Sequence, residues 1–289
     1  MEYIRLGFMP RILSLLSLLA GTCFATAQDQ PKAPPPSDSD KNPVHNLPID
    51  PDKLADAVRD SYYHPDNLSS LECSVSFDWS GVMRALKVDD LPVERQKIIE
   101  GLKVRSHARR NQATEVTFNW SGGEPPEGKV RIEGGLKQLL SRFYQIYWPI
   151  LASPAVPPGT SVENIEPLDD GGVKAHLSQG AGQTEITIDK DHLPTHYAVN
   201  NPAMNGTIEA HYTTSPKPVP GDLRRLTELD VSNLLGAKRN VEVILDYQPA
   251  NGFYVPQHVT FNVVDVSSLG MDFSGCSATK GDASSDPKN

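Results

Sequence analysis

The chain has 289 residues, and its 36 acidic side chains outnumber its 27 lysines and arginines, which gives a formal net charge of −9. Hydrophobic residues make up 38% of the chain and charged residues 22%, so the composition suits a folded core and excludes wholesale disorder. Because the sequence has no basic stripe that could neutralise phosphates, the acidic balance argues against a nucleic-acid partner.

The N-terminus has the pattern of a secretory signal peptide. Arg5 and Arg11 supply positive charge, a short apolar run follows, and Ala25 and Ala27 match the small-residue pattern that precedes a cleavage site. We expect cleavage between Ala27 and Gln28, which would place the mature protein in an extracytoplasmic compartment, the periplasm or the medium.

Two alternatives to a cleaved signal stay open. In the first, the apolar run anchors the protein in a membrane, although it is shorter than the ~20 residues that span a bilayer. In the second, Cys23 is acylated as in a lipoprotein, although Thr22 stands where such proteins carry glycine or alanine. Since no later segment is long and apolar enough to cross a membrane, we expect a mature chain that does not span one.

The chain is expected to divide into four segments. A disordered linker is indicated where prolines alternate with serine, aspartate and lysine and little can be buried. We expect a signal peptide at 1–27, this proline-rich linker at 28–49, a single α+β domain at 50–276 and a disordered polar tail at 277–289.

Two cysteines remain once the signal is removed. Cys73 and Cys276 are an even number in an oxidising compartment, so a disulfide between them is the candidate. It would close a loop of about 200 residues, for which chain entropy gives at most about 4–5 kcal/mol of stabilisation. The alternative is two separate buried thiols, because so wide a spacing carries no pairing information.

The first half of the domain is expected to mix helices with strands. Asp50 and Pro51 suit a helix start, and alternation of apolar and polar residues from Leu71 to Trp79 indicates a strand with one buried face. The predicted elements are a helix over 50–64, a strand over 71–79, a helix over 89–108, a strand over 114–120 and an aromatic-rich helix over 136–151.

The second half is expected to be almost entirely strands. Turns rich in glycine, aspartate, asparagine and proline recur every ten residues or so, as in an antiparallel meander. Strands are predicted over 162–165, 173–177, 183–189, 195–199 and 207–212, then an insertion over 213–240 with a short helix at 222–229, and then strands over 241–247 and 259–266.

This order of elements excludes a parallel α/β fold, because neighbouring strands leave no room for helical crossovers. We predict an α+β fold with a large curved antiparallel sheet, a half-open β-barrel, and with helices packed on its concave side. Two stretches of strand and turn, ITIDKDHLPTHYAV (186–199) and DYQPANGFYVPQHVTFNV (246–263), fit this arrangement.

With these stretches and this order of elements, the region from about 50 to 265 resembles the LolA- and LolB-like periplasmic lipoprotein-carrier families. The resemblance implies an unclosed barrel whose concave side is plugged by helices. It also implies an acylated or lipid ligand. The helix expected over 89–108 and the insertion over 213–240 have no counterpart that we can map.

No catalytic motif is present. The sequence lacks a Gly-x-Ser-x-Gly elbow, a His-Glu-x-x-His pair and a P-loop, so we assign neither an enzymatic activity nor a cofactor. His192, His196 and His211 are the candidate metal ligands. On a strand, residues four apart are separated by about 13 Å, which favours ordinary surface imidazoles and no metal.

Aromatic residues are the most informative set. They lie at strand ends and along the third predicted helix, and they either pack the core or line an apolar cavity between sheet and helix. The cavity candidates are Phe77, Trp79, Phe118, Trp120, Phe143, Tyr147 and Trp148.

The function that these features favour is that of an exported binding protein, a carrier of a lipid or other apolar ligand in the cell envelope. The alternative is a ligand-free interaction or scaffold protein that uses the 213–240 insertion as its contact loop. An enzyme whose signature is not recognisable is a third, weaker reading.

Overall fold

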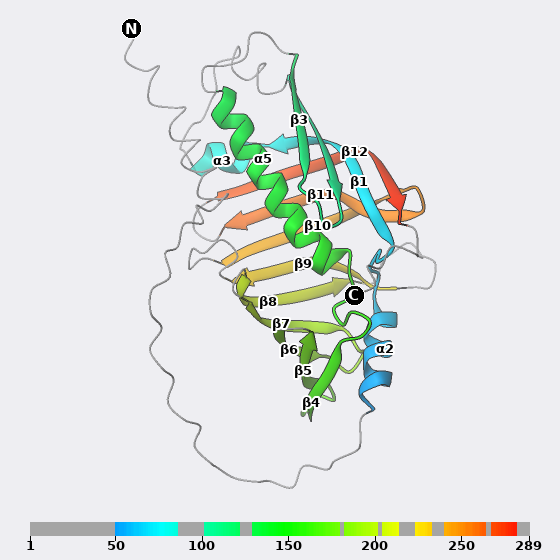
Figure 1. Cartoon of the computed structure of the whole chain (residues 1–289). Helices are drawn as coiled ribbons and strands as arrows, with labels where there is room; N and C mark the ends of the chain where they lie inside the picture. Colours follow the sequence, from blue (N-terminus) through cyan, green and yellow to red (C-terminus); the bar gives the residue numbers. More distant parts are fainter. Residues whose placement is uncertain are drawn as a thin grey trace.

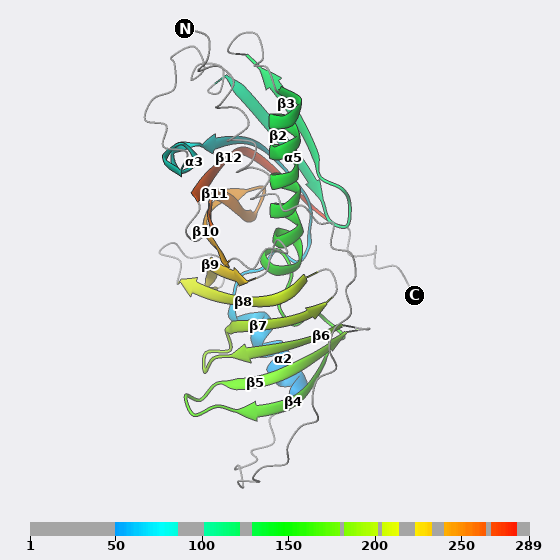
Figure 2. The same ribbon diagram turned by 90° about the vertical axis from the view of Figure 1, so that its left-hand side faces the viewer.

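The computed structural model describes residues 50–85, 101–121, 129–179, 182–201, 204–213, 223–232, 240–263 and 267–281. These residues form one antiparallel sheet of 12 strands, in the order β3-β2-β1-β12-β11-β10-β9-β8-β7-β6-β5-β4, which curls around a long helix (Figures 1 and 2). The predicted α+β fold with a large curved antiparallel sheet is confirmed, and the sheet does not close into a barrel.

The strands in chain order are β1 (Leu68–Asp78), β2 (Leu102–Arg109), β3 (Glu115–Trp120), β4 (Ser161–Pro167), β5 (Val173–Gln179), β6 (Gly182–Ile188), β7 (Pro194–Asn201), β8 (Met204–Thr213), β9 (Arg225–Ser232), β10 (Asn240–Ala250), β11 (Phe253–Val263) and β12 (Ser267–Lys280). The helices are α2 (Pro51–Ser61), α3 (Ser80–Ala85) and α5 (Lys129–Ile146), which continues into one turn of π-helix, η1 (Tyr147–Leu151).

The connectivity is simple. From β4 to β12 each strand pairs with the next one along the chain, and β12 then pairs with β1, which returns the sheet to β2 and β3. The two edges of the sheet are therefore β3 and β4. In the sequence these strands are separated by α5, which runs across the strands between them (Figure 1).

Both long helices cover the same face of this sheet. Ala175, Ile186, Tyr197, Ile208 and Val231 follow one another as direct cross-strand partners, so their side chains share one face. The first two belong to the apolar cluster under α2, and the last belongs to the cluster under α5. We call this the inner face, and the opposite one the outer face.

Helix α2 begins where the sequence indicates. The Asp50 side chain accepts hydrogen bonds from the backbone amides of Asp52 and Lys53, at 3.1 and 3.4 Å, and Pro51 occupies the first turn. Leu54 and Val58 point into the sheet and are buried. The helix ends at Ser61, three residues before the predicted limit.

The helix predicted over 89–108 is wrong for its last part. Residues 102–108 lie in β2, where Val104, Ser106 and Ala108 are buried and the residues between them face outward. Ser106 and Ala108 are small, so the sequence does not show the alternation of buried and exposed residues that is typical of a strand. Pairing with β1 on one side and β3 on the other determines the strand conformation. Residues 89–100 lie outside the described part of the chain.

The short helix predicted over 222–229 is also wrong. This segment contributes β9, a central strand between β8 and β10, in which Leu226, Leu229 and Val231 are buried. The insertion over 213–240 is therefore not one contact loop, because a sheet strand runs through its middle. Residues 214–222 and 233–239 lie outside the described residues.

The sequence prediction missed β12, and the tail expected from residue 277 starts too early. Leu269, Met271 and Phe273 are buried in this strand, and residues 277–280 extend it by pairing with residues 68–72 of β1. Polar residues such as Ser277 show no local strand pattern. They are ordered by a partner strand that lies 200 residues earlier in the chain.

A disulfide joins Cys73 of β1 to Cys276 of β12, with a Cα–Cα distance of 4.2 Å and a sequence separation of 203. It links the two strands through which the beginning and the end of the domain meet. The expected signal peptide, the linker and Cys23 lie outside the described residues. In the part of the chain that the structure describes, no helix is long and apolar enough to cross a membrane.

Candidate functional site

One end of the inner face carries a group of partly exposed apolar side chains, which we call the aromatic end. It comprises Phe77, Trp79, Leu102, Phe118 and Trp120, from the ends of β1, β2 and β3 and the residue after β1. They pack against two buried residues in the first half of α5, Ile132 and Leu136. Leu102 and Trp120 are direct cross-strand partners, so the register of β2 and β3 brings these apolar side chains together at one end of the sheet.

A polar contact holds the start of α5 over this end. The Trp120 indole Nε1 donates a hydrogen bond to Glu133 Oε1 at 2.8 Å, and Lys129 Nζ lies 3.8 Å from the same oxygen. The Phe77 and Trp79 rings are 5.7 Å apart, centroid to centroid. The aromatic end is thus a shaped apolar surface, and its one carboxylate is already paired.

The middle of the inner face is filled. Phe143 of α5 is fully buried, with its ring 5.4 Å from Phe273 and 6.2 Å from Phe261 of the sheet. Tyr147 is also buried, 5.8 Å from the Phe143 ring. The neighbouring Tyr144 hydroxyl shares a hydrogen bond with Ser106 Oγ at 2.9 Å. These residues pack the core, which is the alternative reading of the sequence pattern for Phe143 and Tyr147.

Trp148 has a different role. The Arg110 guanidinium lies 5.6 Å from the centre of the Trp148 ring and donates to the carbonyls of Leu68 and Ala152 and to Ser153 Oγ. Burial lowers the pKa of Arg110. Trp148 is therefore part of a clamp between the end of α5 and the start of β1, away from the aromatic end.

A set of tyrosines lies on the inner face between α2 and α5, and we call it the tyrosine belt. Burial is the largest cause of a raised pKa at every member: Tyr62, Tyr63, Tyr147, Tyr197, Tyr212 and Tyr247. Three hydroxyls bond to the backbone. Tyr62 accepts from the Ala155 amide at 2.6 Å, Tyr63 accepts from the Tyr254 amide at 2.7 Å, and Tyr247 donates to the Leu226 carbonyl at 2.6 Å.

The hydroxyl of Tyr147 differs from these. It is buried, and it has no hydrogen-bond partner among the described residues. A buried, unpaired hydroxyl costs about 1–3 kcal/mol, a loss that water or a polar group of a ligand would remove. Sequence reasoning missed the tyrosine belt because its members are scattered from Tyr62 to Tyr247 and share no local spacing.

The structure separates the seven cavity candidates into two groups. Phe77, Trp79, Phe118 and Trp120 come together at the aromatic end, whereas Phe143, Tyr147 and Trp148 lie farther along α5 and η1 in the core and the clamp. Leu102 also contributes to the aromatic end. It was not recognised, because it fell within the helix predicted over 89–108.

Two groups of side chains on the outer face bring together ligand atoms of the kind that metals take. They are Glu209, His211 and Asp230, and Glu228, Asp230 and Glu242, with the atoms of each group within 4.8 Å of one another. His211 contributes to one group. His196 is the cross-strand partner of Glu209 but belongs to neither group, and His192 lies in a turn with a left-handed backbone. The three candidate histidines therefore do not form one ligand set among the described residues.

His258 on the outer face also has a suggestive geometry. Its Nδ1 lies 2.6 Å from Asp272 Oδ1 and its Nε2 lies 3.0 Å from Thr260 Oγ1. Nucleophilic catalysis also requires donors for a developing oxyanion, but Thr260 lies in a paired strand of the sheet. We therefore describe this as a cross-strand contact.

Comparisons with protein-family models, with curated proteins and with solved structures found no match to this chain.

Proposed function

We propose that the protein is an exported binding protein that holds an apolar ligand, a lipid or an acyl chain, at the aromatic end of the inner face. The observation that carries this proposal is that four partly exposed rings gather there around one leucine, against the buried residues of α5. Apolar surface of this kind, gathered on one side of a fold, is typical of a ligand site.

The sizes of the elements support the proposal. With strands about 4.8 Å apart, a sheet of 12 strands is roughly 50 Å across, whereas the 18 residues of α5 span about 27 Å. A helix is also only about 10 Å wide, much narrower than an 11-residue strand such as β10 is long, at about 36 Å. The described helices therefore cover a strip of the inner face.

The chemistry of the aromatic end favours an apolar ligand. Its charged neighbours in the described part of the chain, Lys129 and Glu133, are engaged with each other and with Trp120, and this pairing favours an apolar over an ionic ligand. Covering about 200 Å² of apolar surface would contribute about 5 kcal/mol before the entropy cost of association. One acyl chain lying across two or three rings provides an area of this order.

The proposal includes export, because the N-terminal pattern is that of a signal peptide. It also includes the likeness to LolA- and LolB-like carriers, which implies an acylated cargo. The aromatic end supplies what such a cargo requires, a surface of rings beside the helix.

Native mass spectrometry tests this function. Delipidated protein, incubated with a membrane lipid extract, is expected to carry adducts of lipid mass. Replacing Trp79 and Phe118 together by alanine should remove most of them. The matched control is Phe253→Ala, which truncates another partly buried ring of the inner face away from the aromatic end. Spectra without adducts, or equal losses in control and test variants, would refute the proposal.

A further inference from the structure

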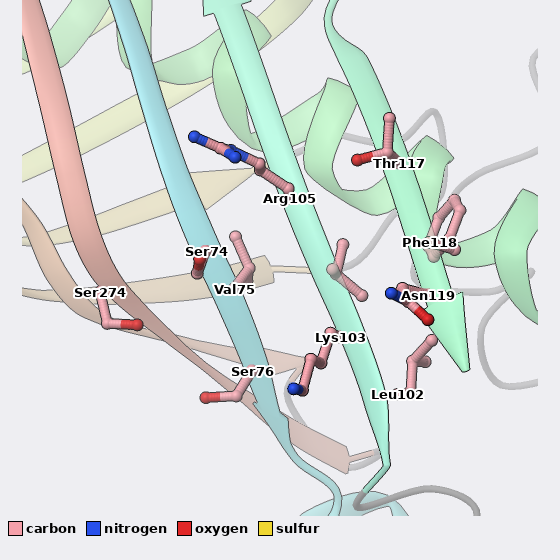
Figure 3. A pocket seen from close by; sticks show the side chains of 11 residues that line it. Ser74, Val75, Ser76, Leu102, Lys103, Arg105, Thr117, Phe118, Asn119 and Ser274 are labelled. Carbon is pink, nitrogen blue, oxygen red and sulfur yellow. The ribbon is translucent and has the colours of Figure 1, made fainter. Parts of the chain in front are cut away.

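A hollow of about 570 Å³ lies on the outer face, over β12, β1, β2 and β3. Its exposed lining residues are polar: Ser74, Ser76, Lys103, Arg105, Thr117, Asn119 and Ser274. Four apolar residues that alternate with them along the strands complete the lining: Val75, Leu102, Val104 and Phe118. The exposed polar residues alternate along the strands with inner-face residues, so they point away from helix α5, which Figure 3 shows behind the strands.

The sheet register arranges these groups in rows. Ser74 is the direct partner of Arg105, and Arg105 is in turn the partner of Thr117. In a parallel row, Lys103 is the partner of Asn119. Direct partners lie about 5 Å apart, so hydroxyl, cationic and amide groups alternate across three strands. Hydroxyl and amide groups both donate and accept hydrogen bonds.

The charge of the hollow is set by one lysine. Arg105 Nε bonds to Glu72 Oε1 at 2.7 Å, so its charge is compensated. Lys103 forms no ion pair with any residue that the structure describes. Among the described residues, the hollow thus carries one positive charge without an ion-pair partner, in a chain whose net charge is −9, whereas the outer face at β8–β10 carries a row of carboxylates.

We propose that this hollow binds an acidic oligosaccharide, with one sugar carboxylate on Lys103 and sugar hydroxyls on the serine, threonine and asparagine side chains. The volume lies within the range of about 300–1,000 Å³ for small-ligand sites. All seven exposed residues of the lining are polar, which favours a polar ligand over a lipid tail. The proposal does not rest on the apolar ligand, since its binding groups are outward-facing polar side chains, whereas the rings of the aromatic end lie on the inner face.

Isothermal titration calorimetry tests the site with trigalacturonate as the acidic probe and maltotriose as the neutral one, at low ionic strength. Saturable binding of trigalacturonate is expected, with at least about tenfold weaker binding of maltotriose, because a charge-assisted hydrogen bond is lost. Lys103→Gln should weaken trigalacturonate binding by about tenfold or more, and Asn119→Ala should weaken both sugars. The control is Lys174→Gln, another outward-facing strand lysine, paired with Glu185, which should leave binding unchanged.

Several results would overturn the proposal. They are no binding of trigalacturonate, equal binding of the two sugars, or equal losses in Lys103→Gln and Lys174→Gln. Sodium sulfate distinguishes a sugar site from a simple anion site. If sulfate displaces trigalacturonate at equal concentration, the lysine is a site for free anions and the oligosaccharide is refuted. These variants change outward-facing side chains and leave all five residues of the aromatic end in place, so lipid adducts in native mass spectra should be unaffected, which separates this test from that of the proposed function.

Discussion

Helices α2 and α5 cover different parts of the inner face of the sheet, and they bury different amounts of apolar surface there. Helix α5 places large aromatic side chains, among them Phe143 and Tyr144, on strands from both ends of the chain. Helix α2 contributes smaller residues, such as Leu54 and Val58, to a cluster over β5 and β6. The sheet is continuous in hydrogen bonding, but its apolar burial is concentrated under α5. We infer that the α5 region determines global stability and that the α2 region adds a weaker extension.

The largest expected effect is alkaline, and it acts on both regions through the tyrosine belt. Burial raises the pKa of Tyr62 and Tyr147 and, next to the belt, of Tyr144. In the unfolded chain tyrosine ionises near pH 10, so the unfolded state loses protons first and stability falls as the pH rises above 10. Each group contributes up to about 1.4 kcal/mol per pH unit, or about 4 kcal/mol for the three at pH 11.

Urea unfolding at pH 8 and pH 11, with tyrosine absorbance recorded in parallel, measures this effect. The midpoint should fall sharply at pH 11, and phenolate absorbance from these residues should appear only with unfolding. An unchanged midpoint would contradict the burial of the three hydroxyls.

The next effect compares the two helices directly. Phe143→Ala should lower the free energy of unfolding by about 3–5 kcal/mol, because it removes a ring that is enclosed on all sides. Leu54→Ala should cost about 2–3 kcal/mol, at the low end for such truncations, since Leu54 packs in the smaller cluster. Urea denaturation of both variants gives the comparison, and Phe143→Leu serves if the alanine variant does not fold. A larger loss for Leu54→Ala would reverse the assignment of stability to α5.

The disulfide belongs to the α5 region, since both of its strands lie in that cluster. Replacing Cys73 and Cys276 together by alanine should lower the free energy of unfolding by about 2–4 kcal/mol, mainly because the unfolded chain regains the freedom of a long loop. Thermal unfolding of the oxidised, the reduced and the doubly substituted protein measures it. If the reduced protein is as stable as the oxidised one, the cross-link does not stabilise the fold.

The sequence predicted the elements whose signals are local. Asp50 and Pro51 marked the start of α2, and strict alternation marked β1. In β12 a period of two was present at Leu269, Met271 and Phe273 but was interrupted by glycine and serine, and its last residues are ordered only by pairing with β1. The segments of β2 and β9 were predicted as helices for the same reason: their strand conformation depends on pairing with neighbouring strands. Neighbouring strands override a weak local pattern, and a single segment does not reveal its neighbours.

The candidate site divides in a similar way. The aromatic residues were recognisable by type, and four of them do meet at the aromatic end. Phe143, Tyr147 and Trp148 lie apart from these four because α5 and η1 place them over other strands of the sheet. The type of a residue does not indicate which part of the sheet it will face. The outer-face hollow arises from the register of four strands, β12, β1, β2 and β3, and most of β2 had been predicted as part of a helix.

The smallest expected effect tests how completely the α5 region is packed. Tyr144→Phe should cost about 1 kcal/mol, because it leaves Ser106 Oγ without its hydrogen-bond partner in the core. Tyr147→Phe should be neutral or slightly stabilising, because the hydroxyl that it removes has no partner among the described residues. Each variant removes one tyrosine hydroxyl, so the two form a matched pair. Urea unfolding gives the free energy of unfolding of each. A loss at Tyr147 as large as that at Tyr144 would mean that ordered water or a bound polar group satisfies the Tyr147 hydroxyl, so that the α5 region is less tightly closed than its apolar contacts indicate.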